Sequence, residues 1–178
     1  MLKKIFLTFI LINLLTSSSF GQTEILIEEI KTDSKFEIVE GKDFKGAIIP
    51  ADYKINFNKK QLAHRFTPSK EDIIQAEIAL TEKYNKSMKK DPRVHRFKKI
   101  KNVRSYFKEY VRQYLGYINE EGEKIIWIHL VQFEKLQKEI GNIELDWKSN
   151  IINGLGDVFY ENMMTLAFNK RTDKLSIW

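Results

Sequence analysis

The clearest alternation of hydrophobic and polar positions lies between residues 67 and 91. Apolar residues recur there every three or four positions, which predicts an amphipathic helix with a broad apolar face. They are Ile73, Ile74, Ala76, Ile78, Leu80, Tyr84 and Met88. Thr67 with Pro68 can cap this helix, and Ser69 with Asp72 offers an alternative capping box. Asp91-Pro92 ends it, because a residue before proline disfavours helical backbone.

Three β-prone segments precede the helix, namely Glu24–Ile30, Lys35–Val39 and Ala47–Phe57. Pro50 interrupts the third segment, and proline cannot donate to a strand ladder. The third segment is therefore predicted to be an edge strand or a bulged strand.

A weaker helical stretch is predicted from Phe97 to about Lys108, and a β-hairpin follows it. Val111, Leu115 and Tyr117 alternate with polar neighbours, and Glu120-Glu121-Gly122 supplies a turn with a glycine that accepts positive φ. The return strand, Lys124–Phe133, is apolar on both faces. We therefore expect it to be central and covered on both sides.

The rest of the chain predicts two more strands. Glu134–Gly156 carries conflicting signals and is left open between helical turns and a strand. Val158–Phe168 is predicted to be a strand with Val158, Tyr160, Met164, Leu166 and Phe168 on one face. A turn at Asn169–Asp173 leads into a last strand, Lys174–Trp178.

These elements predict an α+β fold in which one long helix packs on an antiparallel β-sheet, cystatin-like or NTF2-like by analogy. Neither an internal repeat nor a long linker divides the chain, so residues 22–178 are expected to form a single domain. The chain has no cysteine, so disulfides and a lipid-attachment cysteine are excluded, and a packed core must supply the stability.

Residues 1–21 have the pattern of a cleavable signal peptide. Lys3 and Lys4 precede the apolar run Ile5–Leu15, and Ser19-Phe20-Gly21 offers small residues at the cleavage positions. Eleven helical residues rise only about 16 Å, so a transmembrane anchor is the weaker interpretation, together with a buried first strand. We expect export to the periplasm or the exterior, with the mature chain beginning near Gln22.

Positive charge is concentrated in one stretch. The chain carries 30 basic and 24 acidic residues, and residues 83–112 hold twelve of the basic ones against Asp91 and Glu109. Within residues 86–108, basic side chains alternate with aromatic ones, a mixture that holds anionic polymers. The candidate anion-binding residues are Lys98, Lys99, Lys101, Arg104 and Lys108. The alternative is an amphipathic helix whose lysines keep it soluble.

No motif for catalysis, a metal or a cofactor is present, so no catalytic residue, metal ligand or cofactor is assigned. His64, His95 and His129 are the only imidazoles, and no serine lies in a nucleophile-elbow pattern. Zinc-ligand spacing is missing. Glu120, Glu121 and Glu123 are interpreted as a solvated hairpin tip, and Gly154-Leu155-Gly156 as a turn rather than a phosphate loop. Dispersed carboxylates of a glycosidase remain open, because spatial separation defines them.

Three sequence segments resemble those of a known group of proteins: Phe66–Ile73 with Ala76-Glu77, Glu109–Trp127 (EYVRQYLGYINEEGEKIIW), and Trp147-Lys148. Through them, residues 66–178 resemble a group of uncharacterised small exported proteins of Bacteroidetes-type bacteria. In that group a cysteine-containing segment tends to follow the return strand, and an Asp-Gly-Gly turn precedes the next strand. Here the strand continues as His129-Leu130-Val131, and the turn is Gly154–Asp157. The resemblance implies export and a shared fold. It implies no catalytic or binding chemistry, because the group has no assigned function.

Three functions follow as hypotheses. The first is a non-enzymatic binding or interaction module of the cell envelope, whose partner is an anionic polymer or another envelope protein. The second is a hydrolase of envelope or extracellular polymers, built from dispersed carboxylates and His129. The third is an electrostatic binder of anionic polymer through residues 86–108.

Overall fold

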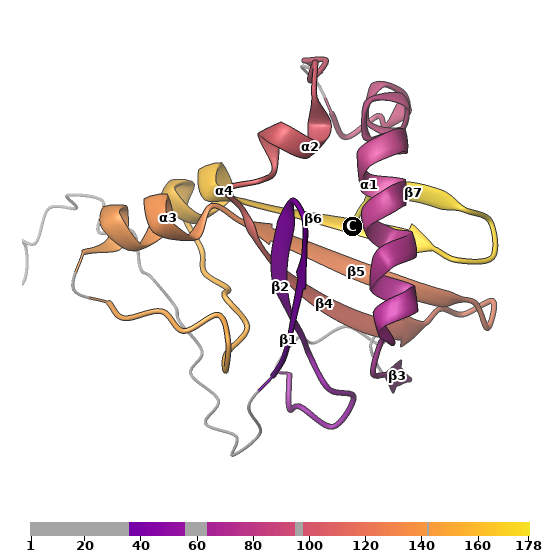
Figure 1. Cartoon of the computed structure of the whole chain (residues 1–178), viewed down its shortest axis with the longest axis horizontal. Coiled ribbons are helices and arrows are strands. Elements are labelled where there is room, and N and C mark those ends of the chain that lie inside the picture. Colours follow the sequence, from indigo (N-terminus) through magenta and orange to yellow (C-terminus); the bar gives the residue numbers. More distant parts are fainter. Residues whose placement is uncertain (1–35, 56–63, 95–97, 142) are drawn as a thin grey trace, which may run out of the picture.

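Seven strands of one sheet organise the described part of the chain (Figure 1). The structure is a computed structural model and describes residues 36–55, 64–94, 98–141 and 143–178. The predicted signal peptide and the predicted strand at 24–30 lie outside these residues. The strands are β1 (Glu37–Gly41), β2 (Phe44–Ile48), β3 (Arg65–Phe66), β4 (Val111–Ile118), β5 (Lys124–Val131), β6 (Met163–Asn169) and β7 (Lys174–Ile177).

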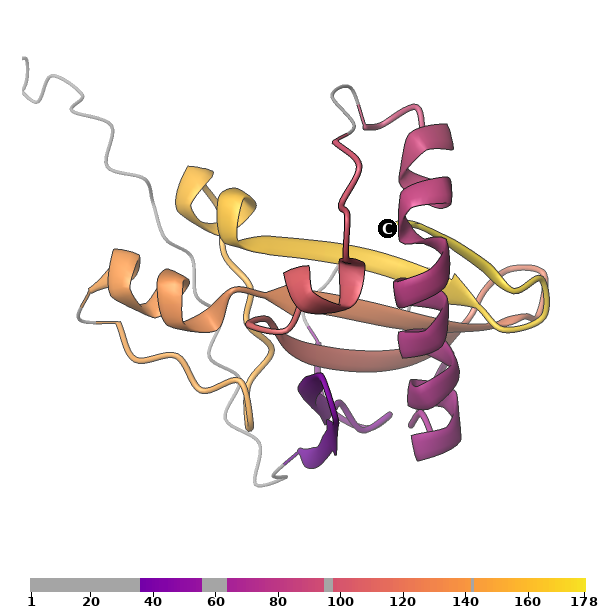
Figure 2. The same cartoon turned by 45° about the horizontal axis from the view of Figure 1, so that its top comes forward.

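The described helices differ greatly in length. They are α1 (Lys70–Lys90), α2 (Val103–Tyr106), α3 (Phe133–Ile140) and α4 (Asp157–Asn162). The long helix α1 crosses one face of the sheet and contacts β5 and β7 (Figures 1 and 2). The prediction of an α+β fold with a long helix packed on a sheet is thus confirmed. In the described part of the chain, no helix combines the length and the apolar character needed to cross a membrane.

The strand order is β1-β2-β4-β5-β6-β7, and β3 pairs with β4 beyond the end of β2. Neighbours pair antiparallel except β2 and β4, which run parallel with Lys45 opposite Val111. The sheet is therefore mixed, and not purely antiparallel as predicted. The segment with Pro50 also differs from its prediction. Its strand β2 ends at Ile48 and lies between two strands instead of at an edge.

The hairpin of β4 and β5 forms as predicted. Gly122 takes a φ of 76° in its turn, and β5 lies between β4 and β6. Alternate residues of β5 face two separate cores: Ile126 and Ile128 pack beneath α1, whereas Ile125 and Trp127 face the opposite side. The return strand is therefore central and covered on both faces, because a strand's successive side chains point to opposite faces.

The segment left open in the sequence covers the face of the sheet opposite α1. It contributes the buried side chains Leu136, Leu145, Trp147, Ile151 and Ile152 to that core. Irregular chain between α3 and α4 is held by one buried side chain of β4. Gln113 Nε2 donates to the carbonyls of Trp147 (2.9 Å) and Asn150 (2.6 Å), and its Oε1 accepts from the Ile152 amide (2.8 Å).

Two predicted elements are wrong in type or length. The helix expected at 97–108 is only the single turn α2, because Asn102 caps a helix at that point and Asn85 bonds both backbone groups of Ile100. The strand expected at 158–168 begins only at Met163. Its first part is the helix α4, where Asn162 donates to the Val158 carbonyl at 2.7 Å.

The capping box predicted at the start of α1 is present, and Ser69 is its N-cap. The Asp72 amide donates to Ser69 Oγ (3.2 Å), and the Ser69 amide donates to Asp72 Oδ2 (3.0 Å). This capping box was the alternative in the prediction; the first-named cap, Thr67 with Pro68, is wrong, since the Thr67 hydroxyl accepts from the Ala51 amide instead.

Replacing Ser69 with alanine is expected to lower the free energy of unfolding by about 1 kcal/mol, because the orphan amide of Asp72 loses its acceptor. Ser69→Asp keeps an acceptor and is the matched control. Urea unfolding measures both. A Ser69→Ala midpoint equal to that of the Ser69→Asp variant would contradict the capping role.

Candidate functional site

The five predicted anion-binding residues do not share a helix face. Lys98, Lys99 and Lys101 lie on exposed irregular chain before α2, and Lys108 follows α2. Arg104 is the member that belongs to α2, and its Nε lies 3.6 Å from Asp43 Oδ2. A common face would require the helix predicted from Phe97 to about Lys108, of which only α2 forms among the described residues, and Phe97 lies outside them.

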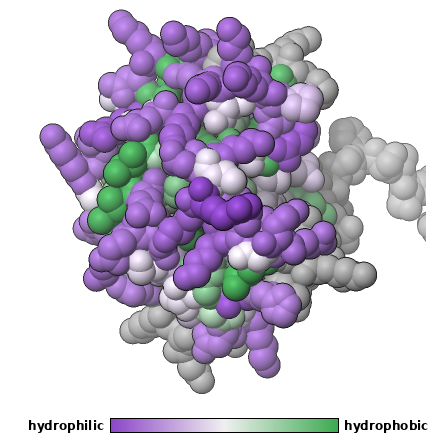
Figure 3. Space-filling model, turned by 90° about the vertical axis from the view of Figure 1, so that its right-hand side faces the viewer, coloured by the Kyte–Doolittle hydropathy of each residue, from purple (hydrophilic) through white to green (hydrophobic). Residues whose placement is uncertain are grey.

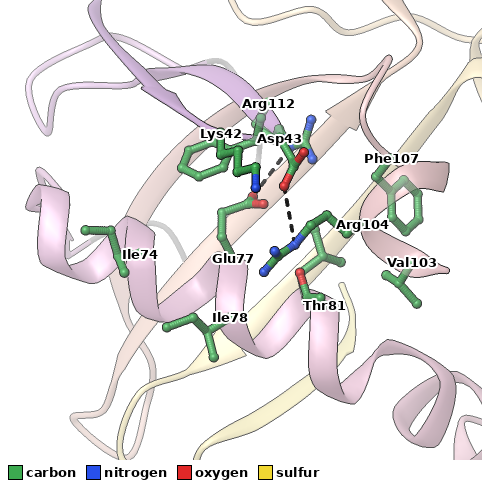
Figure 4. A pocket seen from close by; sticks show the side chains of 12 residues that line it. Lys42, Asp43, Ile74, Glu77, Ile78, Thr81, Val103, Arg104, Phe107 and Arg112 are labelled. Atoms are coloured by element: carbon green, nitrogen blue, oxygen red, sulfur yellow. Dashed lines mark ion pairs between the residues drawn. The ribbon is translucent and has the colours of Figure 1, made fainter.

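Arg104 instead stands at a small cleft of about 150 Å³, hereafter the α1–α2 cleft (Figure 4). Its lining comes from the first half of α1, from the β1–β2 turn with the first residue of β2, from α2 with the residue after it, and from β4. Its apolar lining is Phe44, Ile74, Ile78, Leu80, Val103 and Phe107. Its charged lining is Lys42, Asp43, Glu77, Arg104 and Arg112, with Thr81 beside them.

A buried ion pair forms the floor of the α1–α2 cleft. Glu77 comes from α1 and Arg112 from β4, and Arg112 Nε lies 3.4 Å from Glu77 Oε1. The Tyr114 hydroxyl donates to the same carboxylate oxygen at 2.8 Å. Only 2% of Arg112 and 8% of Glu77 are exposed. Two opposite charges have thus been taken out of water, which costs several kcal/mol per ion before the pairing offsets it.

The guanidinium of Arg112 is incompletely satisfied. Its Nη1 donates to the Tyr110 carbonyl, and its Cζ lies 5.8 Å from the centre of the Phe44 ring. Its Nε, although close to Glu77, makes no hydrogen bond within the described residues. Its contact with Glu77 is therefore an ion pair at 3.4 Å rather than a well-aligned hydrogen bond.

The pKa values on the floor show the effect of burial. Burial raises the pKa of Glu77, and Arg112 and the Tyr114 hydroxyl oppose that rise. Burial and the Glu77 carboxylate raise the pKa of Tyr114 well above its ordinary value. The tyrosine therefore stays protonated and donates to Glu77.

The rim of the α1–α2 cleft is more open than its floor. The side chain of Arg104 is 57% exposed, and its contact with Asp43 is of the kind that contributes little to stability. Ile74 and Ile78 of α1 are 52% and 48% exposed and line the cleft (Figure 4). The rim can therefore rearrange at small cost, whereas the floor is fixed.

Sequence reasoning missed Glu77 and Arg112, although a signal was present at Glu77. Glu77 lies one turn after Ile73, in the middle of the buried stripe of α1. Arg112 lies within a strand whose neighbouring positions are all buried. At Glu77 a charged residue occupies a position where the helical periodicity requires an apolar one, and this is such a signal because an isolated charge is almost never fully buried. Arg112 gave none, because the predicted alternation places it among the polar positions of its strand.

His129 is a core residue with both ring nitrogens engaged. Its Nε2 lies 2.8 Å from the Ile152 carbonyl, and its Nδ1 lies 2.8 Å from Thr165 Oγ1. A carbonyl only accepts, so we assign the proton to Nε2, and Nδ1 accepts from the hydroxyl. The ring shares a strand face with Trp127, and the two rings stack with their centroids 5.0 Å apart. Burial lowers the pKa of His129 to about 4, so the ring is neutral at pH 7.

A hollow of about 440 Å³ borders His129, and its described lining is mainly apolar and contains no Asp or Glu side chain. This arrangement lacks the dispersed carboxylates that the hydrolase hypothesis requires. In the residues that the structure describes, no group of three or more His, Asp or Glu side chains is placed to hold a metal ion.

The acidic hairpin tip is only partly solvated. Glu120 and Glu121 are exposed, but Glu123 is buried. Its carboxylate accepts from Arg171 Nε at 2.6 Å and from Asn119 Nδ2 at 3.1 Å. Glu123 therefore ties the β4–β5 turn to the β6–β7 turn.

Compared with models of protein families, with curated proteins and with solved structures, the chain has no significant match in any of the three. The candidate site therefore depends on its own geometry.

Proposed function

We propose that this protein is an exported, non-enzymatic binding module that takes a small carboxylate into the α1–α2 cleft. The observation that carries the proposal is that two guanidinium groups, Arg104 at the rim and Arg112 at the floor, line one small cleft with apolar walls. Export is supported by the signal-peptide pattern of residues 1–21 and by the resemblance to small exported proteins.

Charge and shape both favour a small monoanion. Lys42, Arg104 and Arg112 face Asp43 and Glu77, so the lining carries one positive charge in excess when Glu77 is ionised. A carboxylate would neutralise that excess and accept from a guanidinium in two parallel hydrogen bonds. A cavity of about 150 Å³ holds a body the size of benzene, which suits the apolar walls of this cleft.

Binding rather than turnover is proposed because the acids of the cleft are already engaged. Tyr114 and Arg112 hold Glu77, and Arg104 holds Asp43. A general base needs a lone pair that can reach the substrate proton. A small ligand would instead displace the weak rim contact of Arg104 and leave the floor unchanged.

Benzoate is the probe for this function, and benzyl alcohol is its neutral counterpart. We expect benzoate to shift amide NMR resonances of residues 74–81 and 103–112 saturably, and benzyl alcohol to shift them weakly. Arg104→Gln should weaken benzoate binding about tenfold, because a charge-assisted hydrogen bond contributes about 1.5 kcal/mol or more.

The matched control is Lys101→Gln, which removes the same charge from exposed chain outside the cleft. It should bind benzoate as the unaltered protein does. Equal affinity for benzoate and benzyl alcohol, or equal weakening by both substitutions, would refute a carboxylate site in this cleft.

A further inference from the structure

A second and larger concavity runs between the C-terminal half of α1 and strand β7. It encloses about 990 Å³ and is hereafter the α1–β7 groove. Its basic lining residues are Lys83, Lys86, Lys90, Arg93 and Lys174. Figure 3 views the molecule from the side that carries α1 and β7 in Figure 1, and hydrophilic side chains dominate this face.

Helical spacing brings the α1 lysines together. Lys83, Lys86 and Lys90 are separated by three and four positions, which places them on one side of the helix. They extend over about 10 Å of helix length, at 1.5 Å per residue. Lys174 approaches the groove from β7, so two separate elements contribute its positive charge.

Two of the five cations already have partners that shape the groove. Lys83 contacts the carboxylate of Asp173 and donates to its carbonyl at 2.9 Å. Arg93 contacts Asp91 Oδ2 at 2.7 Å and donates to the Ile177 carbonyl. Both contacts tie α1 and the chain after it to the β6–β7 hairpin.

The other three cations are uncompensated. Lys86, Lys90 and Lys174 are exposed, and none of them forms an ion pair with another described residue. Three ammonium groups around one groove create a field that attracts an extended anion. Lys86 and Lys90 of this set belong to the basic stretch predicted from sequence, residues 86–108. The third lysine, Lys174, comes from β7.

We infer that the α1–β7 groove binds an acidic polysaccharide. Ser87, Thr172 and Ser176 line it between the lysines and offer hydrogen bonds to sugar hydroxyls. No aromatic ring belongs to its described lining, so the stacking that holds single-stranded nucleic acid has no platform there. Pro92 is its one exposed apolar lining residue, which is too little apolar surface for insertion into a lipid interface.

The probe is oligogalacturonate, whose repeating carboxylates and hydroxyls represent this class. A single-stranded oligo-dT of equal charge and a neutral dextran are the comparison ligands. We expect binding of oligogalacturonate to fall about twentyfold between 50 and 200 mM salt, since three contacts give a log–log slope of about −2. Oligo-dT should bind more weakly, and dextran should not bind.

Two triple variants remove equal charge from different places. Lys86→Gln with Lys90→Gln and Lys174→Gln should abolish both the binding and its salt slope. Lys98→Gln with Lys99→Gln and Lys101→Gln should leave both unchanged, since those lysines lie outside the groove. Equal losses in the two variants, no binding at 50 mM salt, or oligo-dT binding as tightly as oligogalacturonate would each overturn the inference. Benzoate binding in the α1–α2 cleft is measured separately, so the two sites can fail independently.

Discussion

Replacing Arg112 with methionine is expected to lower the free energy of unfolding by about 3–5 kcal/mol at pH 7. Methionine replaces the unbranched stem of arginine as far as Nε and carries no charge, so the substitution leaves the buried Glu77 carboxylate without its counter-ion. Breaking a buried pair from one side carries this large cost because an uncompensated charge remains in a poorly polarisable environment. Denaturant unfolding monitored by tryptophan fluorescence measures the change.

The pH dependence of the Arg112→Met variant tests its cause. Burial already raises the pKa of Glu77, and loss of Arg112 removes a group that opposes the rise. When the pKa of an acid is higher in the folded protein than in the unfolded chain, the fold is most stable with that acid protonated. This stability is lost as pH rises through the folded-state pKa. The deficit of Arg112→Met should therefore shrink as pH falls from 7 toward 5.

A second substitution supplies the control. Glu77→Gln in the Arg112→Met background removes the stranded charge and keeps an acceptor for the Tyr114 hydroxyl. We expect the double variant to be more stable than Arg112→Met alone, because replacing both partners of a buried pair costs less than removing one. A double variant that is no more stable, with a deficit independent of pH, would show that packing and not charge explains the loss.

Acidification from pH 6.5 to about 4 is expected to destabilise the protein by up to roughly 3 kcal/mol through His129. Burial lowers the pKa of this imidazole from 6.5 to about 4. The unfolded chain takes up the proton below pH 6.5, whereas the folded chain resists it until about pH 4. The contribution is fully present above pH 6.5, is lost progressively between these values, and is constant below them.

His129→Gln isolates this contribution. Glutamine does not titrate and can still donate to the Ile152 carbonyl. The difference in unfolding free energy between the parent protein and the variant should fall across pH 6.5–4 and be flat above it. Glu123, whose pKa is lowered chiefly by Arg171, is present in both proteins, so its contribution to the pH dependence cancels from this difference. If the difference did not change with pH, the burial of a neutral imidazole would be refuted.

The elements that were correctly predicted from sequence are those with local causes. The start of α1 depends on Ser69 and Asp72, three residues apart, and the β4–β5 turn depends on Gly122. Each of these signals involves residues only a few positions apart, so it can be recognised in the sequence. The α4 helix was predicted as a strand because Val158 and Tyr160 alternate, whereas burial of Phe159 and Asn162 follows helical spacing.

The two proposed sites could not be predicted from local pattern, because each joins side chains from distant segments. Glu77 and Arg112 meet only when α1 packs on β4, and Lys174 joins Lys86 only when β7 packs on α1. The basic stretch was correctly recognised as a concentration of charge. Its division between exposed chain and a groove depends on where α1 ends, at Lys90 before Asp91-Pro92.

The parallel pairing of β2 with β4 also constrains the route by which the sheet assembles. Lys45 pairs with Val111 across 66 positions of chain, whereas Ile118 and Lys124 pair across six. Closing the longer loop sacrifices more chain entropy, so a topology with this contact folds more slowly than one built from hairpins alone. Until β2 arrives, the outer margin of β4 presents unsatisfied amides and carbonyls. During that interval the exposed edge of β4 can pair with a strand of another molecule, so the folding chain is then most prone to aggregate.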